Sequence, residues 1–256
     1  PSAPGRPEVS EPAIPTPFAR PRQPPRRLKL PQFPSRATYL LIAINAVVFL
    51  LNVLSGSLIT RYGALVPILV TGYGQWWRLI AAGFLHADLI HIMMNLYAFY
   101  GLGRLMERFF GLKRFLAVYG LSLLGCSVLV TLFSDAETPT VGASGAIMGV
   151  LGALLIYFWK YRDLLVGARG FLGQLGRMAL INIGIGLLPG ISWWGHLGGF
   201  LAGAAVGAVL LPKYAHPNWA TEYLELQELS GGARLGTAAI AAAELGLLAL
   251  AFWWRS

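Results

Sequence analysis

Seven long apolar runs follow one another along the sequence and leave few folds open to it. They lie near residues 38–56, 89–106, 115–133, 144–161, 172–188, 194–211 and 235–254. Each is close to the ~20 residues that an α-helix needs to cross a ~30 Å hydrocarbon core. Because that core offers the backbone no water, spanning segments of this length must be helices. Only 12% of the residues are charged, against roughly 25% in soluble domains, which excludes a water-soluble fold. The sequence predicts an all-α polytopic membrane protein.

The regions between and beside these runs give the predicted domain organisation. Residues 1–36 form a Pro/Arg-rich tail that is predicted to be disordered and cytoplasmic. Residues 37–212 form the predicted six-helix core, residues 213–234 a cytoplasmic linker and residues 235–256 a seventh transmembrane helix. An acidic, amphipathic stretch of the linker with Glu222, Glu225 and Glu228 predicts a surface helix. The basic tail offers no fold or aromatic platform for bases, so no nucleic-acid partner is expected.

The positive charges predict how the chain lies in the membrane. With the N-terminus inside, alternating spans place all 20 lysines and arginines inside except Arg61, Arg78 and Arg255. This asymmetry follows the positive-inside rule. We therefore predict a multi-pass integral membrane protein with a cytoplasmic N-terminus, and a bacterial plasma membrane fits the pattern.

A few polar residues interrupt the apolar runs, and such residues are costly in lipid. They are His91 and Asn95 in the second run, Ser144 at the start of the fourth and His196 near the start of the sixth. In these three runs, His91, Ser144 and His196 each precede a basic residue at the inner end by 16 or 17 residues. At ~1.5 Å per residue, all three lie ~24–26 Å above the inner boundary, toward the outer side. Asn95 lies one turn deeper than His91 on the same helical face.

Small residues on two of the runs predict that their helices pack closely. The sixth run carries Gly195, Gly199, Gly203 and Gly207, and the fourth carries Gly145, Gly149 and Gly152. Small residues at this spacing let membrane helices approach with little side chain between their backbones. Ser144 and His196 can therefore reach hydrogen-bonding distance.

A serine beside a neutral histidine forms a nucleophile with its general base. The free N–H groups of Ser144 and Gly145 at a helix N-terminus would stabilise an oxyanion, with His91 and Asn95 as further donors. A third, orienting carboxylate is missing, since Asp135 and Glu137 lie in the outer loop and Asp163 at the inner face, so we expect a Ser–His dyad. Taken singly, each of these residues also fits a packing or hydrogen-bonding role, and only their convergence favours catalysis.

These residues resemble the rhomboid family of intramembrane serine proteases over about residues 38–212. The resemblance implies that Ser144 is the nucleophile and His196 the base, with His91 and Asn95 helping to form the oxyanion hole. The matching positions are Gly142, Ser144 and Gly145 of the family's GxSG motif, His196, Gly199 and Gly203 of HxxGxxxG, and His91 and Asn95 of HxxxN. Supporting matches are Trp77 and Arg78 of a WR pair, Glu107 at the end of the second helix, and His86, whose role looks structural.

The sequence departs from the family pattern at two places. Met148 stands where the family often has a tyrosine that packs on the catalytic histidine, and Glu244 in the seventh span has no assigned role. The seventh span itself resembles the six-plus-one form of the family.

The resemblance implies an intramembrane serine protease that cleaves transmembrane segments of other membrane proteins in the bilayer, without metal or cofactor. One alternative is a catalytically inactive rhomboid-like protein that binds clients. Another is a transporter, although the polar residues gather near one face rather than crossing the membrane.

Overall fold

The computed structural model describes residues 30–215 and 225–255 of the 256-residue chain. Most of the predicted tail and Glu222 of the linker lie outside the described residues. The helices are α1 (Arg36–Leu54), α2 (Leu58–Gly63), α3 (Pro67–Thr71), α4 (Arg78–Ala81), the 3-10 helix η1 (Ala82–Phe84), α5 (Leu89–Phe133), α6 (Ser144–Lys160), α7 (Ala168–Ile185), α8 (Trp193–Val209) and α9 (Gly231–Arg255). Two short strands, β1 (Tyr214–Ala215) and β2 (Glu225–Leu226), pair antiparallel.

Each of the seven apolar runs is helical, and the predicted all-α membrane bundle is confirmed. The second and third runs are joined in α5, which has 45 residues and is interrupted at Gly111. Gly111 has φ 74° and ψ 167°, a conformation that a residue with a side chain rarely adopts. Among the described helices, α1, α5 and α9 are long and apolar enough to cross a membrane, and α6 is a shorter apolar helix.

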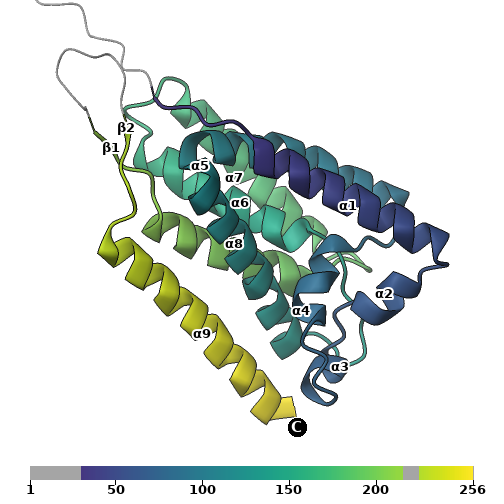
Figure 1. The fold of residues 1–256 in the computed structure, drawn as a ribbon. Coiled ribbons are helices and arrows are strands. Elements are labelled where there is room, and N and C mark those ends of the chain that lie inside the picture. Colours follow the sequence, from purple (N-terminus) through teal and green to yellow (C-terminus); the bar gives the residue numbers. More distant parts are fainter. Residues whose placement is uncertain (1–29, 216–224, 256) are drawn as a thin grey trace, which may run out of the picture.

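The helices run side by side along the long dimension of the molecule (Figure 1). The centre is formed by α5, α6 and α8, which make the most extensive contacts with one another. At the flanks, α1 and α9 lie on opposite sides of this centre, α2 to α4 gather at one end, and β1 and β2 lie at the other (Figure 1). The segment at residues 57–88, between the first and second apolar runs, thus contains short helices of its own.

Glycines allow α6 and α8 to touch backbone to backbone. A Cβ atom placed on Gly199 would overlap the carbonyl of Gly145, and one placed on Gly203 would overlap the backbone of Gly149. The predicted small-residue ridges therefore do face each other. This seam fixes the relative height of the two helices and so the level at which the starts of α6 and α8 meet.

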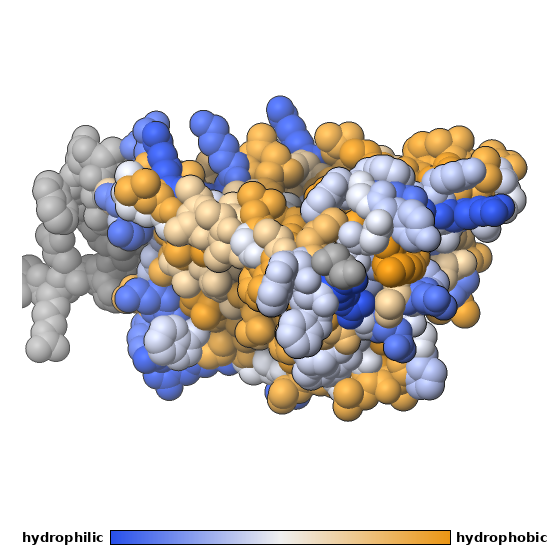
Figure 2. Space-filling model, turned by 90° about the horizontal axis from the view of Figure 1, so that it is seen from below, coloured by the Kyte–Doolittle hydropathy of each residue, from blue (hydrophilic) through white to orange (hydrophobic). Residues whose placement is uncertain are grey.

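The outside of the bundle is apolar over much of its area. Apolar side chains form broad areas of the face seen in Figure 2, and hydrophilic groups lie both between these areas and at the margins. Leu40 on α1, Leu180 on α7 and Trp253 on α9 are 61%, 73% and 75% exposed. A soluble protein rarely exposes so much apolar surface, whereas lipid covers it at no cost.

In the part of the linker that the structure describes, residues 213–215 and 225–230, the predicted surface helix is absent. In its described part, Glu225 belongs to β2 and pairs with Ala215 of β1. The linker is also held against the end of the bundle, where Tyr161 donates to the carbonyl of Pro212 at 2.5 Å and Arg114 donates to that of Gln227 at 2.5 Å. These contacts with core residues favour an extended chain, which the local amphipathic pattern does not reveal.

Candidate active site

Ser144 is the first residue of α6 and is half-buried. The chain enters this helix through Gly142, whose φ of 128° lies in the region that favours glycine. The N–H of Gly142 donates to the carbonyl of Ala82 at 2.9 Å, which ties the turn to η1. A Cβ on Gly142 would lie 2.8 Å from Nε2 of His91 and 3.6 Å from Oγ of Ser144. The bare backbone of Gly142 therefore lies against both the imidazole of His91 and the serine.

The beginning of α6 supplies donors beside Ser144. The first intrahelical bond is donated by Ile147 to the carbonyl of Ala143 at 3.0 Å. The N–H groups of Ser144, Gly145 and Ala146 precede it and have no acceptor within the helix. Together with the positive end of the helix dipole, they can stabilise an anion next to the serine oxygen.

His196 lies in the first turns of α8 and is buried, with 7% of its surface exposed. The helix begins at the cap Ser192, whose side chain accepts from the N–H of Gly195 at 3.1 Å. Gly195 is also where α8 meets α6, since a Cβ on Gly145 would lie 3.2 Å from the Gly195 carbonyl. The residues next to this contact are Ser144 on one helix and His196 on the other.

The imidazole of His196 is fixed by α7. Its Nδ1 lies 3.1 Å from the backbone carbonyl of Asn182. Ser144 and His196 both belong to the described residues, and no hydrogen bond joins their side chains there. Catalytic hydrogen bonds are often long in the free enzyme and shorten once substrate is bound.

The two residues predicted as oxyanion donors lie differently. His91 is at Gly142 and Ser144, as described above, and the ring of His86 lies edge-on to it with centroids 5.1 Å apart. Asn95 is buried one turn further along α5, and its amide donates to the carbonyl of His91 at 2.9 Å. The structure thus brings His91 to the serine, while one amide proton of Asn95 is used within its own helix.

The supporting residues of the family pattern lie away from the serine and hold the surrounding segments. Arg78 is buried and donates to the carbonyl of Ala64 at 2.6 Å, and the indole of Trp77 donates to that of Tyr62 at 2.9 Å. Both bonds tie α4 to α2 and the turn after it. Glu107 accepts from the N–H groups of Ala37 and Thr38 at 2.9 and 2.8 Å, and so caps the start of α1.

Met148 lies on α6 one turn after Ser144 and is 3% exposed. Its packing role beside the histidine stays a prediction. Asn182, in contrast, is absent from the sequence-based site. No side-chain pattern could have indicated it, because the group that contacts His196 is a backbone carbonyl.

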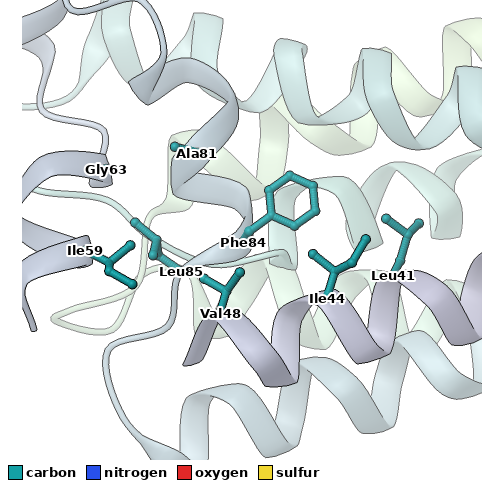
Figure 3. A pocket seen from close by; sticks show the side chains of 8 residues that line it. All are labelled: Leu41, Ile44, Val48, Ile59, Gly63, Ala81, Phe84 and Leu85. Atoms are coloured by element: carbon teal, nitrogen blue, oxygen red, sulfur yellow. The ribbon is translucent and has the colours of Figure 1, made fainter. Parts of the chain in front are cut away.

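An apolar pocket of about 400 Å³ lies elsewhere, between α1, α2 and the α4–η1 segment (Figure 3). Its lining includes Leu41 and Ile44 of α1, Ile59 of α2, and Phe84 and Leu85 near η1. None of these side chains can act as acid, base or nucleophile. Among the described residues there is also no group of three histidines, cysteines or acidic residues placed to hold a metal ion.

The fold and this site define a polytopic helical membrane protein that carries a serine and a histidine at the facing ends of two tightly packed helices. Residues 73–213, more than half of the chain, match the Rhomboid domain family model. The chain therefore belongs to the rhomboid family.

Known proteins similar to the chain come from a plant, a bacterium and a fungus. RHOMBOID-like protein 6, mitochondrial, of Arabidopsis thaliana is 37% identical over 161 residues, which are 61% of this chain and 51% of that protein. Rhomboid protease GluP of Bacillus subtilis is 36% identical over 187 residues, 69% of this chain and 35% of that protein. Rhomboid-type serine protease 2 of Emericella nidulans is 32% identical over 145 residues, 54% of this chain and 27% of that protein. The matched region thus spans about half or less of each of these relatives, two of which are named as proteases.

Proposed function

We propose that this protein is an intramembrane serine protease in which Ser144 is the nucleophile and His196 the general base. The observation that carries the proposal is the backbone contact of α6 with α8, which brings Gly145 against Gly195 and Gly199. A serine and a buried histidine flank this contact at one level of the bundle. In the same place the start of α6 offers free N–H groups.

The proposed reaction is acyl transfer to serine and then to water. Oγ of Ser144 attacks the scissile carbonyl while Nε2 of His196 takes its proton. The N–H groups at the start of α6 and the imidazole of His91 stabilise the oxyanion. His196 then returns the proton to the departing amine, and a water molecule, activated by the same base, releases the acyl group.

The substrate that fits this site is a transmembrane segment of another membrane protein. A regular helix hides its carbonyls in its own hydrogen bonds, so the segment must unwind before it reaches Ser144. Segments with glycine, proline or polar residues unwind at lower cost and are the expected substrates.

The orientation that fits the charges places the N-terminus in the cytoplasm and the site toward the outer side. Arg255, predicted to be outside, donates to the carbonyls of Leu132 and Ser134 at the outer end of α5, at 2.9 and 2.5 Å. Arg78, also predicted outside, lies in the segment that precedes the site. A bacterial plasma membrane, which the positive-inside pattern favours, is part of the proposal.

A cleavage assay in liposomes tests the proposal. The purified protein is reconstituted with a membrane-anchored reporter, alongside Ser144→Ala, His196→Ala and the control Ser55→Ala, which removes an exposed hydroxyl at the end of α1. We expect the parent and the control to cleave, and either active-site variant to lose roughly 10⁴-fold or more in rate. A serine-directed phosphonate should label Ser144 in the parent and in the Ser55→Ala control, but should not label Ser144→Ala or His196→Ala.

Two results would contradict the proposal. Cleavage by Ser144→Ala at the parent rate would show that another group is the nucleophile. Binding of the reporter without cleavage, with no phosphonate labelling, would instead favour the inactive client-binding alternative.

A further inference from the structure

A catalytic histidine needs a fixed tautomer, because only one of its ring nitrogens can take the serine proton. In the structure, Nδ1 of His196 lies 3.1 Å from the carbonyl oxygen of Asn182. A carbonyl oxygen can only accept, so Nδ1 must carry the hydrogen of this bond. In the neutral imidazole the other nitrogen, Nε2, is then left without a proton and with its lone pair free.

Carboxylates, which orient the histidine in a triad, lie elsewhere in the described chain. Asp88 caps the start of α5, where it accepts from the N–H of His91 at 2.8 Å. Asp135 and Glu137 are exposed in the turn after α5, and Asp163 lies beyond the opposite end of α6. Glu244 of α9 is buried, but its Oε1 lies near Gly125 of α5. Gly125 packs on Gly198, which points about 200° away from His196 around α8.

The carbonyl of Asn182 has the electrostatic properties of an orienting group. It belongs to the last turn of α7, where the partial negative charge of the helix dipole is concentrated. It also accepts from the N–H of Gly186 at 3.1 Å, so that its two lone pairs have two donors. A helix end of this sign stabilises the imidazolium that forms when the serine loses its proton.

The end of α7 packs closely on the start of α8 at Gly186. A Cβ on Gly186 would lie 3.2 Å from both Cα and Cδ1 of Trp193, the first residue of α8. Around this contact α7 is exposed, with Leu180 at 73% and Leu187, just after the helix, at 74%. The position of the Asn182 carbonyl relative to His196 therefore depends on how closely Gly186 packs against Trp193.

We propose that the backbone carbonyl of Asn182 is the positioning group of the dyad, which holds His196 in its Nδ1–H tautomer and leaves Nε2 free for the proton of Ser144. It takes the place that a carboxylate occupies in a triad. The proposal rests on the proposed function, since it assigns a role to His196 as base. It also implies that the activity of the site depends on how the end of α7 packs against the start of α8.

The tautomer can be measured without any substrate. The chain has 4 histidines, so ¹⁵N-histidine labelling of the full-length protein in micelles gives a spectrum that the His196→Ala variant can assign. We expect His196 at neutral pH to show a protonated Nδ1 and an unprotonated Nε2. A protonated Nε2 would overturn the proposal, whether or not the protein cleaves its reporter.

A pair of variants tests whether the carbonyl causes this preference. Gly186→Val pushes the end of α7 away from Trp193, whereas Gly184→Val places the same side chain into open space two residues earlier. We expect Gly186→Val to give a mixture of tautomers and to lower kcat about tenfold or more, within the roughly 10²–10⁴-fold that acid–base catalysis contributes. Gly184→Val should match the parent in both measurements.

A backbone variant keeps the test decisive if Gly186→Val fails to fold. Replacing Ile183 by its α-hydroxy analogue converts the preceding amide to an ester and makes the Asn182 carbonyl a weaker acceptor, without changing a side chain. The same exchange at Ile181 weakens the Leu180 carbonyl and serves as control. Parent-like tautomer and kcat in the Ile183 ester would overturn the proposal. If Ser144→Ala cleaves like the parent while the tautomer is as expected, the proposed function fails and the structural assignment of the bond stands.

Discussion

The seam between α6 and α8 predicts a specific consequence of adding one methyl group. In Gly199→Ala, the new Cβ would overlap the carbonyl oxygen of Gly145, which is backbone and cannot rotate away. The two helices must therefore separate at this level by about 1 Å, and a misplacement of ~1 Å costs roughly 10²-fold in rate when reacting groups must be aligned. Overpacking of a tight core also costs about 1–3 kcal/mol of stability.

We therefore expect Gly199→Ala to lower reporter cleavage about 100-fold and to lower the temperature of unfolding in micelles. Gly120→Ala is the matched control, because a Cβ on Gly120 of α5 meets nothing within 4 Å. It should cleave and unfold like the parent, or slightly better, since alanine favours helix over glycine.

Phosphonate labelling of Ser144 separates the two effects in Gly199→Ala. If the seam positions the dyad, labelling should slow in parallel with cleavage at a temperature where the variant remains folded. The reasoning is refuted if folded Gly199→Ala cleaves and labels at the parent rate, because the seam would then not set the distance between Ser144 and His196.

Three further substitutions test the contacts that hold the bundle around this seam. Glu107→Gln should lower unfolding stability by about 1–3 kcal/mol in chemical denaturation, because the charged acceptor that caps α1 at Thr38 is lost. Arg78→Lys should destabilise by a similar amount in the same assay, since lysine cannot reproduce the guanidinium bonds to the carbonyl of Ala64 and its neighbours. Arg255→Gln should speed hydrogen exchange in the last turns of α9, with the core helices unchanged, because the two charged bonds to the end of α5 are lost.

Periodicity and length were sufficient to predict the helices, because lipid allows a long apolar run few alternatives. They were not sufficient to predict how helices join. The charged stretch around Arg108 and Lys113 separates the two apolar runs, but the break itself is confined to the single residue Gly111, and helical geometry continues on both sides of it. For the described residues 225–230 the predicted linker helix was wrong, because long-range contacts such as that of Arg114 with Gln227 hold this part extended.

The candidate site could be predicted only where side chains carry it. Ser144, His91 and His196 were predicted as site residues because polar groups are rare and costly in apolar runs. Glu107 illustrates the limit, since the helix start that it caps lies 69 and 70 residues away in the sequence. Asn182 illustrates it more strongly, because its contact with His196 is made by an atom that every residue has.

The use of backbone groups at this site follows from its surroundings. A carboxylate beside His196 would have to be desolvated within the bundle, and a buried charge costs several kcal/mol unless it is fully paired. Helix ends provide partial charges without that cost. The first N–H groups of a helix are left unpaired, and the carbonyl of Asn182 has a second lone pair beyond the one that accepts from Gly186. The start of α6 offers donors to an oxyanion and the end of α7 offers an acceptor to an imidazolium. Both charges of the proposed reaction can thus be stabilised by backbone dipoles, provided that glycines at positions 145, 186 and 199 keep the three helix ends within reach.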